Sequence, residues 1–114
     1  MNILKMMEES CKVIIVVDGQ LYFEETFANN EVASKFVADW IFDKEFRIGV
    51  KPFSEEFEIP DHFYEEFASK EDVFNKVVEA SHFEVAANVK YEIIKENSYI
   101  VVGYENSNHE MVFG

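Results

Sequence analysis

His62, Glu65 and Glu66 place an imidazole and two carboxylates within one short stretch of the chain, which is the side-chain chemistry of a metal site. On a helix, positions i, i+3 and i+4 lie close together, so at least two of these groups could reach a common cation. The same spacing arises by chance in an acidic chain, and neither an HExxH pattern nor an EF-hand loop is present. The sequence therefore favours a surface helix over a metal site, and we expect no cofactor.

The other patterns typical of enzymes are missing from the sequence. The four glycines are too far apart to form a phosphate-binding loop. No local motif places His82 or His109 beside a nucleophile and a buried acid. Adjacent carboxylates such as Glu24 and Glu25 point in different directions on a helix or a strand, which weakens an acid–base role. The sequence therefore predicts a protein that is not an enzyme.

The strongest signal is the density of acids between residues 53 and 72, where eight acids stand against the single base Lys70. An even distribution would place about four acids in a stretch of this length. Clustered like charges repel one another, and a surface that only needs to be soluble avoids this by mixing signs. We therefore predict a partner-binding surface here, with apolar anchors among its carboxylates: Glu55, Glu56, Glu58, Glu65, Glu66, Phe57 and Tyr64. Four further acids could extend it: Glu24, Asp39, Asp43 and Glu45.

The net charge of −13, with Arg47 as the only arginine, indicates the kind of partner. Nucleic acids and anionic lipids need Lys and Arg to neutralise their phosphates, so direct binding to nucleic acid or membrane is disfavoured. A basic protein, in particular one that binds nucleic acid, is the expected partner.

In size, charge and compactness the chain resembles phage-encoded nucleic-acid mimics, including inhibitors of restriction and CRISPR systems, and the acidic immunity proteins that neutralise nuclease toxins. The resemblance implies a small inhibitor, encoded by a phage or mobile element, that blocks a basic nucleic-acid-binding site on another protein. An immunity protein that neutralises a toxin is an alternative. Another is a structural or regulatory subunit that oligomerises through a sheet edge or exposed aromatic residues. A third is a small enzyme or metal-binding domain that uses the His62 cluster.

The length and composition indicate one folded domain over residues 1–114, because 48% of the residues are hydrophobic and 12 are Phe. Cys11 is the only cysteine and stands beside an apolar run, so we expect a buried thiol rather than a disulfide or a nucleophile. Acids interrupt the N-terminal stretch where a signal peptide would be apolar, and no run is long enough to span a membrane. We expect a cytoplasmic protein, in the host cytoplasm if a phage encodes it.

Strand patterns occur at the two ends of the chain. Residues 11–17 read as a central strand buried on both faces, and Asp18-Gly19 predicts a hairpin turn into a second strand. In that second strand we expect Leu21, Phe23 and Phe27 on one face and Tyr22 on the other. Residues 83–93, 99–104 and 110–113 read as further strands, although a helix continuing from residue 73 also fits part of 82–95.

Helix patterns lie between the strands, and residues 48–60 read as a loop or short edge strand. A helix from Asn30, its expected N-cap, has one apolar stripe: Val32, Ala33, Phe36, Val37, Trp40 and Ile41. Asp61 is expected to cap a second helix, running to about Ala68, whose Phe63 and Phe67 face the core, and Ser69 to Asp72 resembles a capping box that opens a third. The third helix is expected to bury four residues: Val73, Phe74, Val77 and Val78. This order predicts an α+β fold in a single domain. Its mainly antiparallel sheet, built from the N-terminal hairpin and two or three C-terminal strands, has two or three intervening helices packed on one face.

Overall fold

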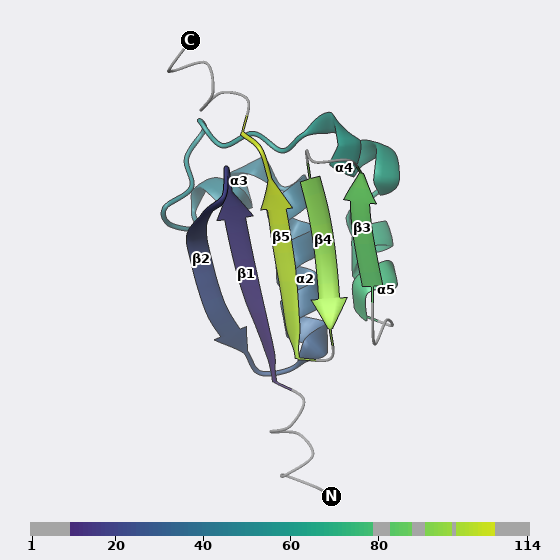
Figure 1. The fold of residues 1–114 in the computed structure, drawn as a ribbon. Helices are drawn as coiled ribbons and strands as arrows, with labels where there is room; N and C mark the ends of the chain where they lie inside the picture. Colours follow the sequence, from purple (N-terminus) through teal and green to yellow (C-terminus); the bar gives the residue numbers. More distant parts are fainter. Residues whose placement is uncertain (1–9, 79–82, 88–90, 97, 107–114) are drawn as a thin grey trace, which may run out of the picture.

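Five strands form one mixed sheet in the computed structural model, which describes residues 10–78, 83–87, 91–96 and 98–106 (Figure 1). In chain order they are β1 (Cys11–Val17), β2 (Gln20–Phe27), β3 (Phe83–Ala87), β4 (Tyr91–Glu96) and β5 (Tyr99–Tyr104). Their order in the sheet is β2-β1-β5-β4-β3, and every neighbouring pair is antiparallel except β1 and β5, which run parallel. The α+β class and the mostly antiparallel sheet are therefore confirmed, with one parallel pair in its middle.

Four helices in the described part of the chain connect the strands: α2 (Asn30–Phe42), α3 (Lys44–Ile48), α4 (Asp61–Glu66) and α5 (Lys70–Val78). Figure 1 shows α2 and α5 behind the sheet, with the opposite face open toward the viewer. No pattern in the sequence predicts α3. It forms because Asp43 ends α2 and also caps α3, accepting a hydrogen bond from the backbone N–H of Phe46 at 3.1 Å. No strand forms between residues 48 and 60, so that segment is a loop.

The N-terminal hairpin turns at Asp18 and Gly19, whose φ angles of 53° and 80° confirm the predicted turn. The register of β2 shifts between the partners of Ile15 and Val16, which leaves Tyr22 as an extra residue opposite β1. Such a bulge interrupts the alternation of side chains along a strand. The prediction that Leu21 and Phe23 lie on the same face is therefore wrong: Leu21 pairs with Val16 and is 59% exposed, whereas Phe23 pairs with the buried Ile15. Tyr22 and Phe23 instead both contact aromatic side chains from the helical side.

Strand β1 lies inside the sheet, but only one of its faces is fully buried. Cys11, Val13, Ile15 and Val17 point into the core, whereas the side chains between them are half-buried. The expectation that both faces are buried is wrong because the described helices cover one side of the sheet only.

Three of the expected helix starts can be compared with the structure. Asn29, not Asn30, caps α2 by accepting from the backbone N–H of Val32 at 2.9 Å, and Val32 itself is exposed. Asp61 lies inside the first turn of α4 and makes no cap hydrogen bond, so that prediction is also wrong. The capping box at α5 is confirmed, except that the Asp72 carboxylate bonds the backbone N–H of Ala68 rather than that of Ser69. Ser69 accepts from the backbone N–H of Asp72 at 3.1 Å, and Asp72 reaches back to Ala68 N–H at 2.9 Å.

Aromatic and aliphatic side chains fill the space between the helices and the sheet. Cys11, Trp40, Phe63 and Phe67 are each 0% exposed, which confirms their predicted place in the core. In α5, Val73 and Val77 are fully buried, but Phe74 and Val78 only half-buried. The described parts of 83–93 belong to two strands, β3 and β4, rather than to one, so the helical alternative is wrong for them. The predicted strand at 110–113, His82 and His109 lie outside the described residues.

Candidate functional site

The loop after α3 carries the first group of predicted contact residues, and Phe53 and Phe57 attach it to the core. Phe53 is 3% exposed and lies edge-on to the Trp40 ring, with ring centres 5.1 Å apart. Phe57 packs edge-on against Phe53 and against Tyr22, at 5.2 Å in both cases. Phe57 is thus half-buried by contacts within the fold, while Glu55 and Glu56 are exposed.

Asn106, which is 1% exposed, fastens this loop to the end of β5. Its side-chain amide donates to the Glu56 carbonyl at 2.8 Å, and its side-chain oxygen accepts from the Glu58 backbone N–H at 3.2 Å. Its own backbone N–H donates to the Asp18 carboxylate at 3.0 Å. The backbones on both sides of Phe57 are therefore held in place, and the Glu58 side chain is exposed. No pattern in the sequence predicts this role for Asn106.

Helix α4 presents the second group of carboxylates. Phe63 is buried on the inner side, with its ring centre 4.6 Å from that of Tyr91, whereas Glu65 and Glu66 are exposed. Burial raises the pKa of the Tyr91 phenol, and the nearby charges of Glu66 and Glu65 raise it further. Tyr64 is 40% exposed, but its hydroxyl donates to the Ile41 carbonyl at 2.9 Å. Tyr64 is therefore partly committed to the fold and only partly available to a partner.

Both groups of carboxylates lie over the same end of the sheet. The register places Val17, Tyr104 and Tyr91 in one row across β1, β5 and β4. The loop is bonded to Asn106, just beyond Tyr104, and α4 packs on Tyr91. In Figure 1 the loop and α4 follow one another along the upper end of the sheet. We call this surface the acidic end; its residues are Glu55, Glu56, Glu58, Asp61, Glu65 and Glu66.

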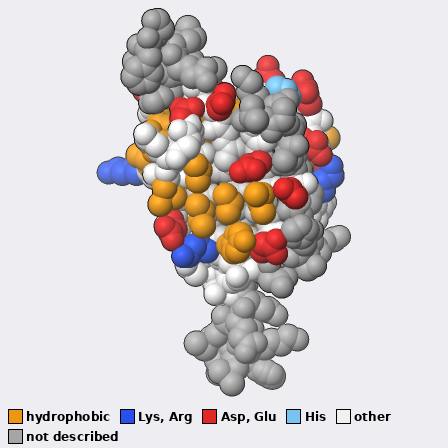
Figure 2. Space-filling model, in the orientation of Figure 1, with side chains coloured by type: hydrophobic (Ala, Val, Ile, Leu, Met, Phe, Trp, Pro, Cys, Tyr) orange, Lys and Arg blue, Asp and Glu red, His pale blue; other side chains and the backbone are white. Residues whose placement is uncertain are grey.

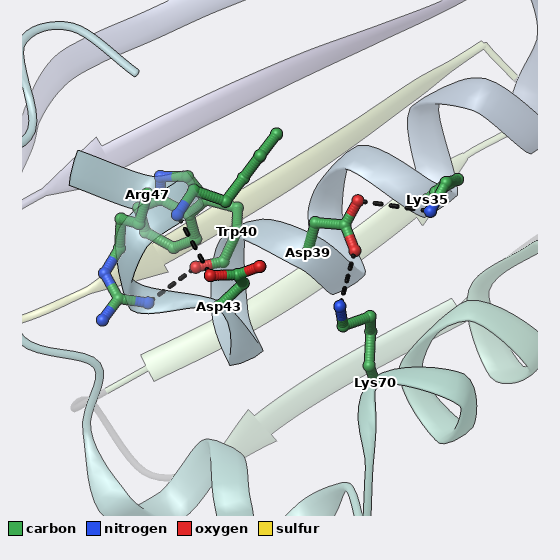
Figure 3. A network of polar contacts seen from close by, with 7 residues as sticks. Lys35, Asp39, Trp40, Asp43, Arg47 and Lys70 are labelled. Carbon is green, nitrogen blue, oxygen red and sulfur yellow. Dashed lines mark hydrogen bonds and ion pairs between the residues drawn. The ribbon is translucent and has the colours of Figure 1, made fainter. Parts of the chain in front are cut away.

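Most cations of the described residues are engaged elsewhere, whereas Lys44 and Lys51 are exposed and form no ion pair within the described residues. Lys35 and Lys70 both pair with Asp39, at 3.4 and 3.2 Å (Figure 3). Lys76 pairs with Asp72 and Lys12 with Glu24. Among the four acids that could have extended the surface, Glu24 and Asp39 are thus paired, Asp43 caps α3, and Glu45 is exposed.

Two further cations are buried inside the domain. Arg47, 6% exposed, donates to the Trp40 carbonyl at 2.7 Å (Figure 3) and to the Ile41 carbonyl at 3.2 Å. Lys95, 1% exposed, donates to the Val77 carbonyl at 2.7 Å, and burial lowers its pKa. Within the described ranges, none of the six carboxylates of the acidic end forms an ion pair.

A metal site at the acidic end would have to use His62. The His62 ring stacks on that of Tyr91, with centres 5.4 Å apart and planes 26° apart. In the part of the chain that is described, no three His, Cys, Asp or Glu side chains come together as ligands. The exposed carboxylates of the acidic end can accept charge-assisted hydrogen bonds from Lys or Arg side chains. The hydrogen bonds and packing of the backbone fix their positions.

Comparison with known proteins adds no relative: no family model, no curated protein and no solved structure matches the chain. None of the helices in the described segments is long and apolar enough to cross a membrane.

Proposed function

We propose that the protein is a non-enzymatic binding protein that docks its acidic end on a basic, nucleic-acid-binding site of another protein and blocks that site. In this proposal it acts as an inhibitor encoded by a phage or mobile element. The observation that carries the proposal is that the six carboxylates of the acidic end have no ion-pair partner among the described residues, although six described lysines and arginines do bind acids or carbonyls elsewhere.

The arrangement of the acidic end favours such docking physically. A partner's Lys or Arg side chains would meet carboxylates whose backbone is already ordered by Asn106 and by the packing of Phe57 and Phe63. Pre-ordering lowers the entropic cost of association. The unneutralised charge also attracts a basic surface over a distance of about one Debye length, roughly 8 Å at physiological salt, which speeds the encounter.

The test compares two variants with the same change of net charge. In one, Glu55, Glu56 and Glu65 become Gln; in the matched control, the exposed residues Glu25, Glu31 and Glu71 become Gln. Both should remain folded, because none of the six side chains makes an ion pair in the described structure. Immobilised proteins are exposed to nuclease-treated bacterial lysate, and captured proteins are identified by mass spectrometry. Release is then measured with increasing salt and with added duplex DNA.

We expect the wild type and the control to capture the same nucleic-acid-binding proteins, and DNA and salt to release them. The acidic-end variant should retain less than about a tenth of this capture, since each lost charged contact is worth about 1.5–3 kcal/mol. Equal losses in both triple variants would show that net charge alone governs capture. Capture that DNA does not compete for would show that no nucleic-acid-binding site is blocked. Either result contradicts the proposal.

A further inference from the structure

The face of the sheet that the described helices leave open carries an apolar row. Ile14 on β1 is in register with Val101 on β5, which is in register with Ile94 on β4. Directly paired residues on neighbouring strands point to the same face of a sheet. All three are half-buried, whereas their sequence neighbours on the other face are buried in the core. Figure 2 shows hydrophobic side chains gathered in the middle of this face.

Carboxylates stand at both ends of this row. The register continues from Ile14 to Glu24 on β2 and from Ile94 to Glu84 on β3, and both glutamates are exposed. Lys12 pairs with Glu24 at 2.8 Å, but Glu84 has no ion pair within the described residues. Acidic side chains accordingly border the apolar patch on both sides in Figure 2.

A further carboxylate lies close to the middle of the face. The next row contains Val16, Gly103 and Glu92, again in register. A Cβ atom added to Gly103 would lie 3.5 Å from Cγ and 3.6 Å from Oε2 of Glu92. The Glu92 side chain therefore leans over the space that glycine leaves open, beside the apolar row. It forms no ion pair with any described residue.

We propose that this face, here called the open face (Ile14, Val16, Ile94, Val101, Gly103 and Glu92, bordered by Glu24 and Glu84), binds a basic amphipathic helix of a partner protein. Apolar side chains of that helix cover Ile14, Val101 and Ile94, and its Lys or Arg side chains reach Glu92 and Glu84. This surface is distinct from the acidic end, and the proposal does not depend on the function proposed above.

The dimensions and the charge of the open face specify this occupant. Neighbouring strands lie about 4.8 Å apart, so the three apolar residues span about 10 Å. A helix rises about 1.5 Å per residue, and about seven residues, or two turns, cover that length. Apolar positions i, i+3 or i+4, and i+7 match it. A second copy of this chain would bring glutamates against glutamates, which is unfavourable for a chain of net charge −13.

The probe is a synthetic 15-residue peptide with Leu at positions 4, 7, 8 and 11 and Lys or Gln elsewhere, compared with a scrambled peptide of the same composition. Binding to the full-length protein is measured by fluorescence anisotropy, and the contact surface is mapped by amide chemical shifts. In one variant Ile14, Ile94 and Val101 become Thr, which keeps a β-branched side chain in each strand. In a second variant Glu92 becomes Gln. The matched controls are Val32→Thr and Glu31→Gln, both at exposed positions on α2.

We expect the amphipathic peptide to bind wild type and both controls alike, at least tenfold more tightly than the scrambled peptide does, with shifts on β1, β4 and β5. The threonine variant should bind at least tenfold more weakly and the Glu92 variant at least threefold more weakly. Equal binding of the scrambled peptide, absence of binding to wild type, or a wild-type dimer that the threonine variant abolishes would each overturn the proposal. If the threonine variant does not fold, the Glu92→Gln variant decides: peptide binding equal to that of wild type overturns the proposal.

Discussion

Replacing the buried Arg47 by Met tests the claim that the only arginine of the chain serves the fold rather than a partner. Its guanidinium donates to the Trp40 carbonyl at 2.7 Å and to the Ile41 carbonyl at 3.2 Å, and it lies 5.9 Å from the centre of the Trp40 ring. Methionine keeps most of the apolar stem and removes these interactions. The variant therefore isolates the polar contribution of Arg47.

The size of the effect follows from the contacts. The short charged hydrogen bond to Trp40 contributes about 1.5–3 kcal/mol. The longer bond contributes less, because the Ile41 carbonyl keeps the hydroxyl of Tyr64 as a donor at 2.9 Å. The ring contact is near the distance limit and adds about 0.5 kcal/mol. Removing a buried charge offsets part of the loss, since a desolvated guanidinium is costly. We expect a net loss of about 2–3 kcal/mol, which lowers the melting temperature by about 8–12 °C in a domain of this size.

The free energy of unfolding is measured by urea denaturation followed by circular dichroism. Lys44→Met is the matched control, because it removes the same charge from the same helix at an exposed position; its stability should stay within about 0.5 kcal/mol of wild type. If the two variants lose equal stability, the role assigned to Arg47 is refuted. The capture proposed for the acidic end should be unchanged in Arg47→Met at temperatures where this variant is folded.

Two other substitutions give further expected outcomes. Asn106→Ala should lower the free energy of unfolding by about 2 kcal/mol and expose the Glu58 amide to faster hydrogen exchange, because two loop hydrogen bonds are lost; unchanged protection of that amide would contradict the role of Asn106. Above pH 10, the free energy of unfolding should fall less steeply in Tyr104→Phe than in wild type. The reason is that burial raises the pKa of the folded Tyr104 phenol above its unfolded value of about 10. The unfolded chain then loses this proton first, and wild-type stability falls as pH rises. Parallel stability curves of wild type and Tyr104→Phe from pH 8 to 11 would show that this phenol contributes nothing.

Features whose causes lie close together in the sequence were predictable. The Asp18-Gly19 turn needs only two residues that tolerate positive φ, and the box at Ser69 needs residues three apart. Phe63 and Phe67 share a helical spacing and both reach the core. Helix α3 was missed although its cap, Asp43, stands three residues before Phe46, because one aspartate ends one helix and begins the next.

Features that depend on distant residues were not predictable from a single sequence. The parallel pairing of β1 with β5 joins the two ends of the described chain, and no local pattern encodes it. Asn106 bonds residues about 50 and 88 positions earlier, so its role in holding the loop has no sequence signature. The open face also depends on register: Ile14, Val101 and Ile94 form a row only once three strands are aligned.

The acidic end lies between these two cases. The density of acids identified the segment, but density alone could not separate carboxylates that have a partner from those that do not. The structure makes that division: Asp39 and Asp72 are paired with lysines, whereas Glu55, Glu56 and Glu65 are not paired with any described residue. Like charges without counterions reduce the stability of the folded state. Replacing them by glutamine should therefore leave the fold as stable or more stable while it removes partner contacts. If these carboxylates served only the fold, the glutamine variants would be less stable and would capture the same proteins. Measuring stability and capture on the same variants therefore separates the two roles.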